Sequence, residues 1–159
     1  NLERKIYETR KRIENKAFDA SLDNFYICSI SSKSIIYKGL YLAEAWSDFY
    51  LDIKDPTFLS RDAIFHQRFS TNTAPGWSLA QPFRAIAHNG EINTYKGNKN
   101  WMKIHEQEMN SPLFDDIENL KPVIQQGASD SAALDNVFEL LNISGQPAPL
   151  AKLMLIPDA

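Results

Sequence analysis

Residues in the middle and the second half of the chain have types and spacing suited to the hydrolysis of an amino acid amide. Such a substrate needs a planar donor for its α-carboxylate, an acceptor for its ammonium group, a nucleophile, and fixed N–H donors for the developing oxyanion. Arg68 could bind the carboxylate, because a guanidinium forms a two-bond fork that lysine cannot form. The side-chain amide of Asn89 and the backbone N–H of Gly90 could form an oxyanion hole, and Asp130 could accept hydrogen bonds from the ammonium group.

Each of these residues also has a structural interpretation. Arg68 could form an internal ion pair, and Ser70 and Thr71 could form a turn instead of binding the same carboxylate. The Asn-Gly pair is the strongest short signal for a hairpin turn. Asp130 follows the expected N-cap Ser129, where a carboxylate stabilises the start of a helix and is kept ionised by the helix dipole. Taken singly, the residues leave both interpretations open.

The elements that must position these side chains are short and mixed in type. Apolar alternation predicts strands over residues 25–31, 35–38, 63–70 and 83–88. Helical spacing predicts helices over residues 1–16, 40–52, 93–109, 130–144 and 150–156. The fourth helix has one apolar face, made of Leu134, Val137, Phe138 and Leu141. Strands and helices do not alternate regularly, so the sequence predicts an α+β fold.

Composition and charge argue against several classes of protein. The 159 residues suit one domain or a part of one, and the formal net charge of −3 argues against nucleic-acid binding. The chain has no apolar run near the ~18 residues of a membrane span, and no signal-peptide pattern. The basic run between Arg4 and Lys16 is interleaved with glutamates, which predicts a solvated helix face.

Metal and thiol chemistry find little support in the sequence. The three histidines, His66, His88 and His105, lack the close spacing of a metal-ligand pair, so no metal site is predicted. Cys28, the one cysteine, lies in the predicted strand over residues 25–31 and should be a small buried side chain.

Long runs of sequence closely match one enzyme family. The runs are HQRFSTNT (66–73), LAQPFR (79–84), AHNGEINT (87–94), GNKNWM (97–102), SDS (129–131), LDN (134–136) and MLIP (154–157). They resemble the glutamine-hydrolysing domain of glutamate synthase, a class II glutamine amidotransferase. Other class II amidotransferases share only the arginine segment, His-Asn-Gly and Ser-Asp-Ser/Thr, so the longer runs favour glutamate synthase.

The resemblance implies a fold and a set of site residues. The fold would be the αββα sandwich of the Ntn hydrolases, with the whole chain belonging to one class II amidotransferase domain. By position, Arg68 would bind the α-carboxylate of L-glutamine with Thr71 nearby. Asn89 and Gly90 would form the oxyanion hole, and Asp130 would hold the α-amino group.

The resemblance also implies chemistry outside this segment. In such enzymes an N-terminal cysteine attacks the amide, and the released ammonia aminates 2-oxoglutarate at a second site. The segment itself should hold no cofactor, whereas the complete enzyme would use FMN and an iron–sulfur cluster, with electrons from NADPH, NADH or ferredoxin. Implied partners are the remaining synthase domains and an NADPH-linked small subunit or ferredoxin, in the cytoplasm or the plastid stroma.

The chain departs from the family pattern at its first residue. The family begins with its nucleophilic cysteine, whereas this chain begins with Asn1, so we expect an internal segment whose nucleophile lies upstream and which is inactive alone. Cys28 has no evident base, and Gly127-Ala-Ser-Asp-Ser131 lacks the second glycine of a serine-hydrolase elbow. A non-catalytic Ntn-like module that binds glutamine, or is only structural, remains the alternative to an enzyme.

Overall fold

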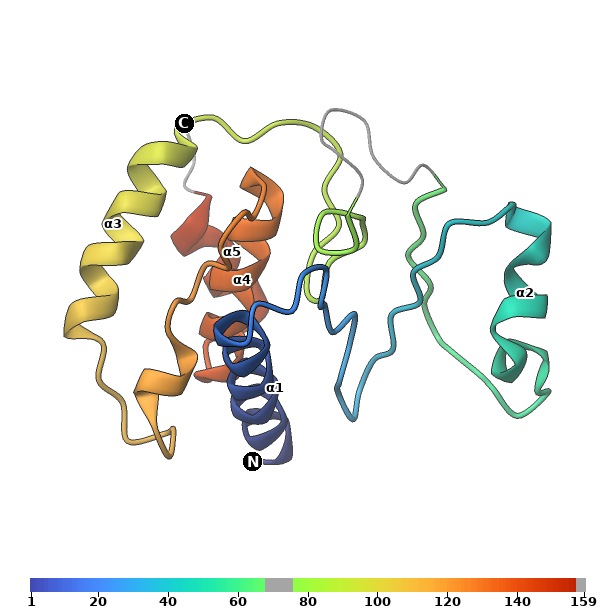
Figure 1. The fold of residues 1–159 in the computed structure, drawn as a ribbon, viewed down its shortest axis with the longest axis horizontal. Helices are drawn as coiled ribbons and strands as arrows, with labels where there is room; N and C mark the ends of the chain where they lie inside the picture. The colour runs from blue at the N-terminus through green and yellow to red at the C-terminus, as the bar shows by residue number, and fades with distance from the viewer. Residues whose placement is uncertain (68–75, 157–159) are drawn as a thin grey trace.

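Helices dominate the part of the chain that the structure describes, residues 1–67 and 76–156 of a computed structural model (Figure 1). Four helices of eight or more residues lie together on one side of the molecule, and the short α2 lies apart from them on the other side. The elements in chain order are α1 (Leu2–Asp19), η1 (Ala43–Ala45), α2 (Trp46–Phe49), η2 (Leu51–Lys54), α3 (Tyr95–Glu108), η3 (Ile117–Leu120), α4 (Asp130–Ile143) and α5 (Ala148–Leu155).

The hydrophobic core lies where α1, η3 and α4 meet. Its buried members are Tyr7, Phe114, Leu120, Val123 and Leu140. The rings of Tyr7 and Phe114 pack with their centroids 6.5 Å apart. Polar contacts reinforce the same junction. The side-chain amide of Asn15 in α1 donates to the carbonyl of Asn119 in η3 and to that of Lys121, the residue after η3. The core thus holds the first and last thirds of the chain together.

The structure confirms four of the predicted helices, with shifted ends. Asn1 caps α1 by accepting the N–H of Glu3, and Ser129 caps α4 by accepting the N–H of Ala132 at 3.2 Å. Both caps satisfy backbone donors that the first helical turn leaves unpaired. The helix predicted over residues 40–52 is wrong, since three short pieces (η1, α2 and η2) occupy that region.

The predicted strands over residues 25–31, 35–38 and 83–88 do not form, and residues 63–67 of the fourth are also without regular structure. A strand needs the backbone of a neighbour as its partner, and no strand is found in the described residues. Side chains instead accept hydrogen bonds from backbone N–H groups of these segments. For example, the N–H of Ile36 donates to Ser29 Oγ at 2.9 Å. Of the predicted α+β fold, the described residues therefore show the helices without the strands.

The sequence pattern alone misjudges the burial of two helix faces. Leu134, Val137, Phe138 and Leu141 of α4 are only half-buried, because α4 buries the side that carries Ser131, Asp135 and Asn136. The basic run of α1 is not simply a solvated face, since Arg10 and Lys11 are 2% and 3% exposed. Both errors have one cause: each of these buried polar groups has a partner on another segment, which periodicity does not reveal.

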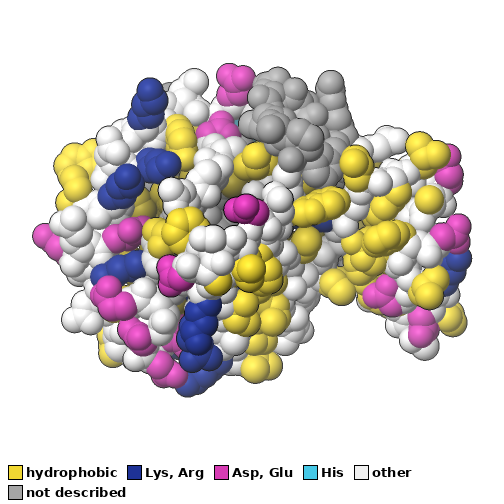
Figure 2. All heavy atoms as spheres, in the orientation of Figure 1, with side chains coloured by type: hydrophobic (Ala, Val, Ile, Leu, Met, Phe, Trp, Pro, Cys, Tyr) yellow, Lys and Arg dark blue, Asp and Glu magenta, His cyan; other side chains and the backbone are white. Residues whose placement is uncertain are grey.

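Residues 37–62 form a second region, which we call the aromatic lobe. Its rings contact one another, with centroid distances of 4.4 Å for Tyr37–Tyr50 and 5.3 Å for Tyr41–Phe49. Large apolar side chains of the lobe face solvent, and Figure 2 shows them gathered over one side of it. No helix of the described ranges is both long and apolar enough to cross a membrane.

Candidate functional site

The predicted oxyanion residues lie on a segment that is tied to the start of α4. Asp130, the first residue of α4, accepts the N–H of Ile92 with Oδ2 at 2.7 Å. Its other oxygen accepts the N–H of Ser131 at 2.6 Å. Ile92 follows Asn89 and Gly90 by two to three residues, so this carboxylate lies beside the predicted oxyanion turn. The structure thereby connects Asp130 to the segment that carries Asn89 and Gly90.

The environment of Asp130 favours its ionised form. Partial burial raises the pKa of this carboxyl, but the N–H groups of Ile92 and Ser131 and the Ser131 hydroxyl more than offset that effect. The pKa of Asp130 is therefore lowered overall. A carboxylate oxygen accepts more than one hydrogen bond, so Asp130 retains capacity for an ammonium group. Its place in the first turn of α4 also favours negative charge.

Gly90 adopts a backbone conformation that requires glycine. Its φ of 143° lies in the region that L side chains rarely adopt. A Cβ on Gly90 would lie 3.5 Å from the His88 ring, an ordinary contact, so the backbone conformation and not the space excludes other residues. Asn89 and Gly90 are both exposed, which leaves their N–H groups accessible to a substrate.

A histidine and a serine connect the turn to α4 a second time. Nδ1 of His88 lies 3.1 Å from Ser131 Oγ, and that hydroxyl lies 3.3 Å from Asp130 Oδ1. A serine-hydrolase triad requires the carboxylate to hold the histidine, but here Asp130 contacts the serine. Ser131 is also buried. These contacts fit a structural connection between α4 and the turn.

Asp135 was missed as an important residue by the sequence analysis. It is 1% exposed, and it accepts the backbone N–H groups of Arg84 (3.3 Å), Ala85 (2.7 Å) and Ile86 (2.9 Å). Burial raises the pKa of Asp135, and the three donors only partly oppose that rise. One turn further along α4 than Asp130, it fixes the segment that leads to Asn89. The available signal in the sequence was the position of Asp135, one turn after the small residues Ser131 and Ala132 on the same side of α4.

The substrate-clamp prediction falls on a part of the chain without structural description. Arg68 and Thr71 lie outside the described residues, so their predicted contact with the α-carboxylate stays a prediction. Asn89, Gly90 and Asp130 are the predicted site residues that the structure describes.

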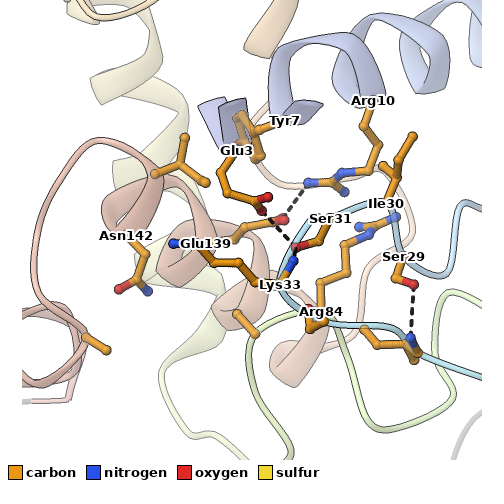
Figure 3. A pocket seen from close by; sticks show the side chains of 15 residues that line it. Glu3, Tyr7, Arg10, Ser29, Ile30, Ser31, Lys33, Arg84, Glu139 and Asn142 are labelled. Atoms are coloured by element: carbon orange, nitrogen blue, oxygen red, sulfur yellow. Dashed lines mark hydrogen bonds and ion pairs between the residues drawn. The ribbon is translucent and has the colours of Figure 1, made fainter. Parts of the chain in front are cut away.

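A cavity of about 310 Å³ lies next to Arg84 and Ala85, between α1, α4 and residues 29–36 (Figure 3). Two ion pairs flank it: Arg10 with Glu139 at 2.5 Å, and Arg84 with Glu14 at 2.5 Å. Burial raises the pKa of Glu139, although the charge of Arg10 acts in the opposite direction. Because these cations are already paired with carboxylates, the network is best explained as a structural connection between α1 and the segment that carries Arg84.

The described residues offer little for metal or thiol chemistry. In residues 1–67 and 76–156, no three His, Cys, Asp or Glu side chains are grouped so that they could hold a metal ion. Cys28 is a free thiol that is half-buried, less than the sequence predicted. The arrangement around Asn89, Gly90 and Asp130 therefore remains the candidate site, with donors and a carboxylate but no described nucleophile.

A family model described as glutamine amidotransferases class-II matches residues 1–159. This chain belongs to that family. The amidotransferase is 55% identical over 155 residues to the glutamate synthase [NADPH] large chain of Azospirillum brasilense, a match over 97% of this chain and 10% of that protein. It is 47% identical to the glutamate synthase [NADH] of Saccharomyces cerevisiae, over 97% of this chain and 7% of that protein.

A plant protein gives a similar result. The amidotransferase is 45% identical to the chloroplastic ferredoxin-dependent glutamate synthase of Oryza sativa subsp. japonica, over 100% of this chain and 10% of that protein. The chain thus spans a tenth or less of the length of each of these relatives. Family membership confirms the resemblance that the sequence motifs predicted.

Proposed function

We propose that this amidotransferase segment is the glutamine-hydrolysing portion of a glutamate synthase. The observation that carries the proposal is the hydrogen bond from the Ile92 N–H to Asp130, which sets a carboxylate beside the exposed Asn89-Gly90 turn. An anionic acceptor next to a pair of exposed N–H donors suits a substrate with an ammonium group at one end and an amide at the other. The names of the relatives support glutamate synthase as the parent enzyme.

Each site residue has a proposed role toward L-glutamine. Asp130 accepts hydrogen bonds from the α-ammonium group through lone pairs that Ile92 and Ser131 leave available. Asn89 and Gly90 donate N–H groups to the oxyanion that forms when a thiolate attacks the amide carbon. Arg68, with Thr71, binds the α-carboxylate. Ammonia leaves, and water then releases glutamate from the enzyme.

The ammonia-consuming half of the reaction is proposed for other parts of the polypeptide. There, ammonia and 2-oxoglutarate would be converted to glutamate by reductive amination, with FMN and an iron–sulfur cluster passing on electrons from an external donor. A cluster needs several thiolates, and Cys28 is the one cysteine of this chain, so the cluster is proposed for another part of the polypeptide, together with FMN. NADPH, NADH and ferredoxin are all possible donors, since relatives are named for each.

We further propose that the chain is part of a single αββα sandwich. The support is the apolar alternation of residues 25–31 and 35–38, together with the exposure of Phe25, Ile30 and Ile35. In a sandwich these side chains would be covered, and backbone groups now bonded to side chains would pair with strands. The proposed partners are the other synthase domains and a small subunit or ferredoxin, in the cytoplasm or the plastid stroma.

The proposal is tested by replacing Arg68 in the full-length protein that contains this sequence. We expect wild-type protein to release ammonia from L-glutamine, and Arg68→Ala to raise KM by about 10- to 100-fold with a smaller change in kcat. Arg61→Ala is the matched control, because the side chain of Arg61 in the aromatic lobe is 92% exposed. It should keep the wild-type KM.

Two results would contradict the proposal. A full-length wild-type protein without glutamine-dependent ammonia release would favour a non-catalytic module. An active wild type whose KM is unaffected by Arg68→Ala would remove Arg68 from the carboxylate site while leaving the enzyme assignment in place.

A further inference from the structure

His88, the residue before the oxyanion turn, has both backbone polar groups bound by one side chain. The His88 N–H donates to Gln81 Oε1 at 2.6 Å, and the His88 carbonyl accepts from Gln81 Nε2. A primary amide presents one acceptor and one donor side by side, like the backbone of a neighbouring strand. Gln81 thus pairs with His88 in the way that a strand would.

The other anchors of this segment lie farther from Asn89. Asp135 binds the N–H groups of residues 84–86, and Asp130 binds the N–H of Ile92. Among the described hydrogen bonds, the pair from Gln81 holds the peptide groups directly before Asn89. The peptide that joins His88 to Asn89 includes the carbonyl bound by Gln81, so its orientation sets the direction in which the Asn89 side chain leaves the backbone.

The ring of His88 is held by a separate contact. Nδ1 contacts Ser131 on α4 at 3.1 Å, while Gln81 binds the backbone of the same residue. The ring also lies beside Gly90, where it would contact a Cβ at 3.5 Å. His88 is therefore fixed both through its backbone and through its side chain, and the turn begins from that fixed residue.

Oxyanion donors stabilise a transition state only when they are held within about 0.5 Å of the productive position. Asn89 and Gly90 are exposed, and Gly90 has a backbone conformation with few intrinsic restraints. Contacts that hold the turn from outside must supply the precision. The amide of Gln81 supplies such contacts through the His88 backbone, and Gln81 is not among the residues proposed to bind glutamine.

We propose that Gln81 is a positioning residue for the oxyanion hole, which it orients through the backbone of His88. This inference rests on the proposed glutaminase function. Loss of the Gln81 amide should misplace the donors that act in the transition state, and leave the groups that bind the ends of glutamine in place. The expected signature is a loss in kcat with little change in KM.

The experiment measures glutamine-dependent ammonia release by the full-length protein as wild type, Gln81→Ala, Gln81→Glu and Gln107→Ala. Gln81→Ala should lower kcat by about 10- to 100-fold and change KM by less than about threefold. Gln81→Glu has nearly the same shape and keeps an acceptor for the His88 N–H, but its carboxylate faces the His88 carbonyl. It should lower kcat while folding normally.

Gln107→Ala is the matched control, since Gln107 is an exposed glutamine on α3. It should keep wild-type kcat and KM. Circular dichroism and thermal unfolding establish whether each variant is folded. If Gln81→Ala does not fold, the kinetics of Gln81→Glu decide the question.

The outcomes separate this inference from the proposed function. Wild-type protein that releases no ammonia contradicts the glutaminase proposal and this inference with it. An active wild type with a folded Gln81→Ala or Gln81→Glu of unchanged kcat overturns the positioning role alone. A rise in KM at constant kcat would overturn it too, because it would assign Gln81 to substrate binding.

Discussion

The helical side of the molecule and the aromatic lobe contain the same residue types but use them differently. On the helical side, Leu120 and Asp135 are 0% and 1% exposed, and α1, η3 and α4 enclose a shared core. In the lobe, Leu51 is 70% exposed, and the ion pair of Arg61 with Asp62 lies in solvent. Context thus decides the contribution of a leucine or an aspartate, and paired substitutions in the two regions measure the difference.

The largest difference is expected for the aspartates. Asp135→Ala leaves three partly buried N–H groups of residues 84–86 without their acceptor, and should lower the free energy of unfolding by about 3–5 kcal/mol. Asp62→Ala removes an exposed ion pair and should cost less than about 1 kcal/mol. Urea unfolding of the 159-residue chain, followed by circular dichroism, measures both. Equal losses in the two variants would show that the regions do not differ in this way.

A smaller difference is expected for the leucines. Leu120→Ala opens a cavity in the core and should lower the free energy of unfolding by about 2–4 kcal/mol. Leu51→Ala should change it by less than about 1 kcal/mol, since most of Leu51 already contacts water. The same urea titration serves here. A cost for Leu51→Ala that matches that of Leu120→Ala would mean that the lobe is packed against a surface in solution.

The smallest expected effect is a change with pH. Burial lowers the pKa of Lys11 from 10.5 to about 8, whereas the unfolded chain retains the ordinary value. Between these pH values the unfolded state binds more protons, so Lys11 makes the folded state more stable as pH rises, by ~1 kcal/mol per pH unit. Lys11→Met should remove this contribution. Lys54→Met in the lobe should not, because Lys54 is exposed.

The measurement is the free energy of unfolding at intervals between pH 8 and pH 10 for wild type and both variants. The relevant quantity is the difference in slope between wild type and Lys11→Met, which cancels groups common to both proteins. Parallel curves for wild type and Lys11→Met would contradict the buried position of the Lys11 ammonium group.

Local signals in the sequence were sufficient for the start of α4 and for the family. Ser129 is the N-cap of α4 in the structure as predicted, because capping depends only on neighbouring residues. The HNG and SDS motifs predict that Asn89, Gly90 and Asp130 belong to one site, and the Ile92–Asp130 hydrogen bond places Asp130 on the segment that follows the Asn89-Gly90 turn. Such signals need no knowledge of distant segments.

Long-range contacts explain the errors. Arg10 and Lys11 are buried because Glu139 and the Pro122 carbonyl meet them from segments more than a hundred residues away. Asp135 is buried because residues 84–86 supply its donors. The strand predictions counted apolar alternation correctly, but a strand also needs a partner, and alternation does not identify one.

At this site, single side chains bind several backbone groups each, so the loss of one residue leaves several groups unpaired. In a paired sheet, many weak contacts share the task, and the loss of one is tolerated. Here Asp135 serves three consecutive peptide groups, and Gln81 serves both sides of one residue. Genetic variation in this part of the chain will therefore be tolerated very unevenly, with a few irreplaceable positions standing among neighbours that can change freely.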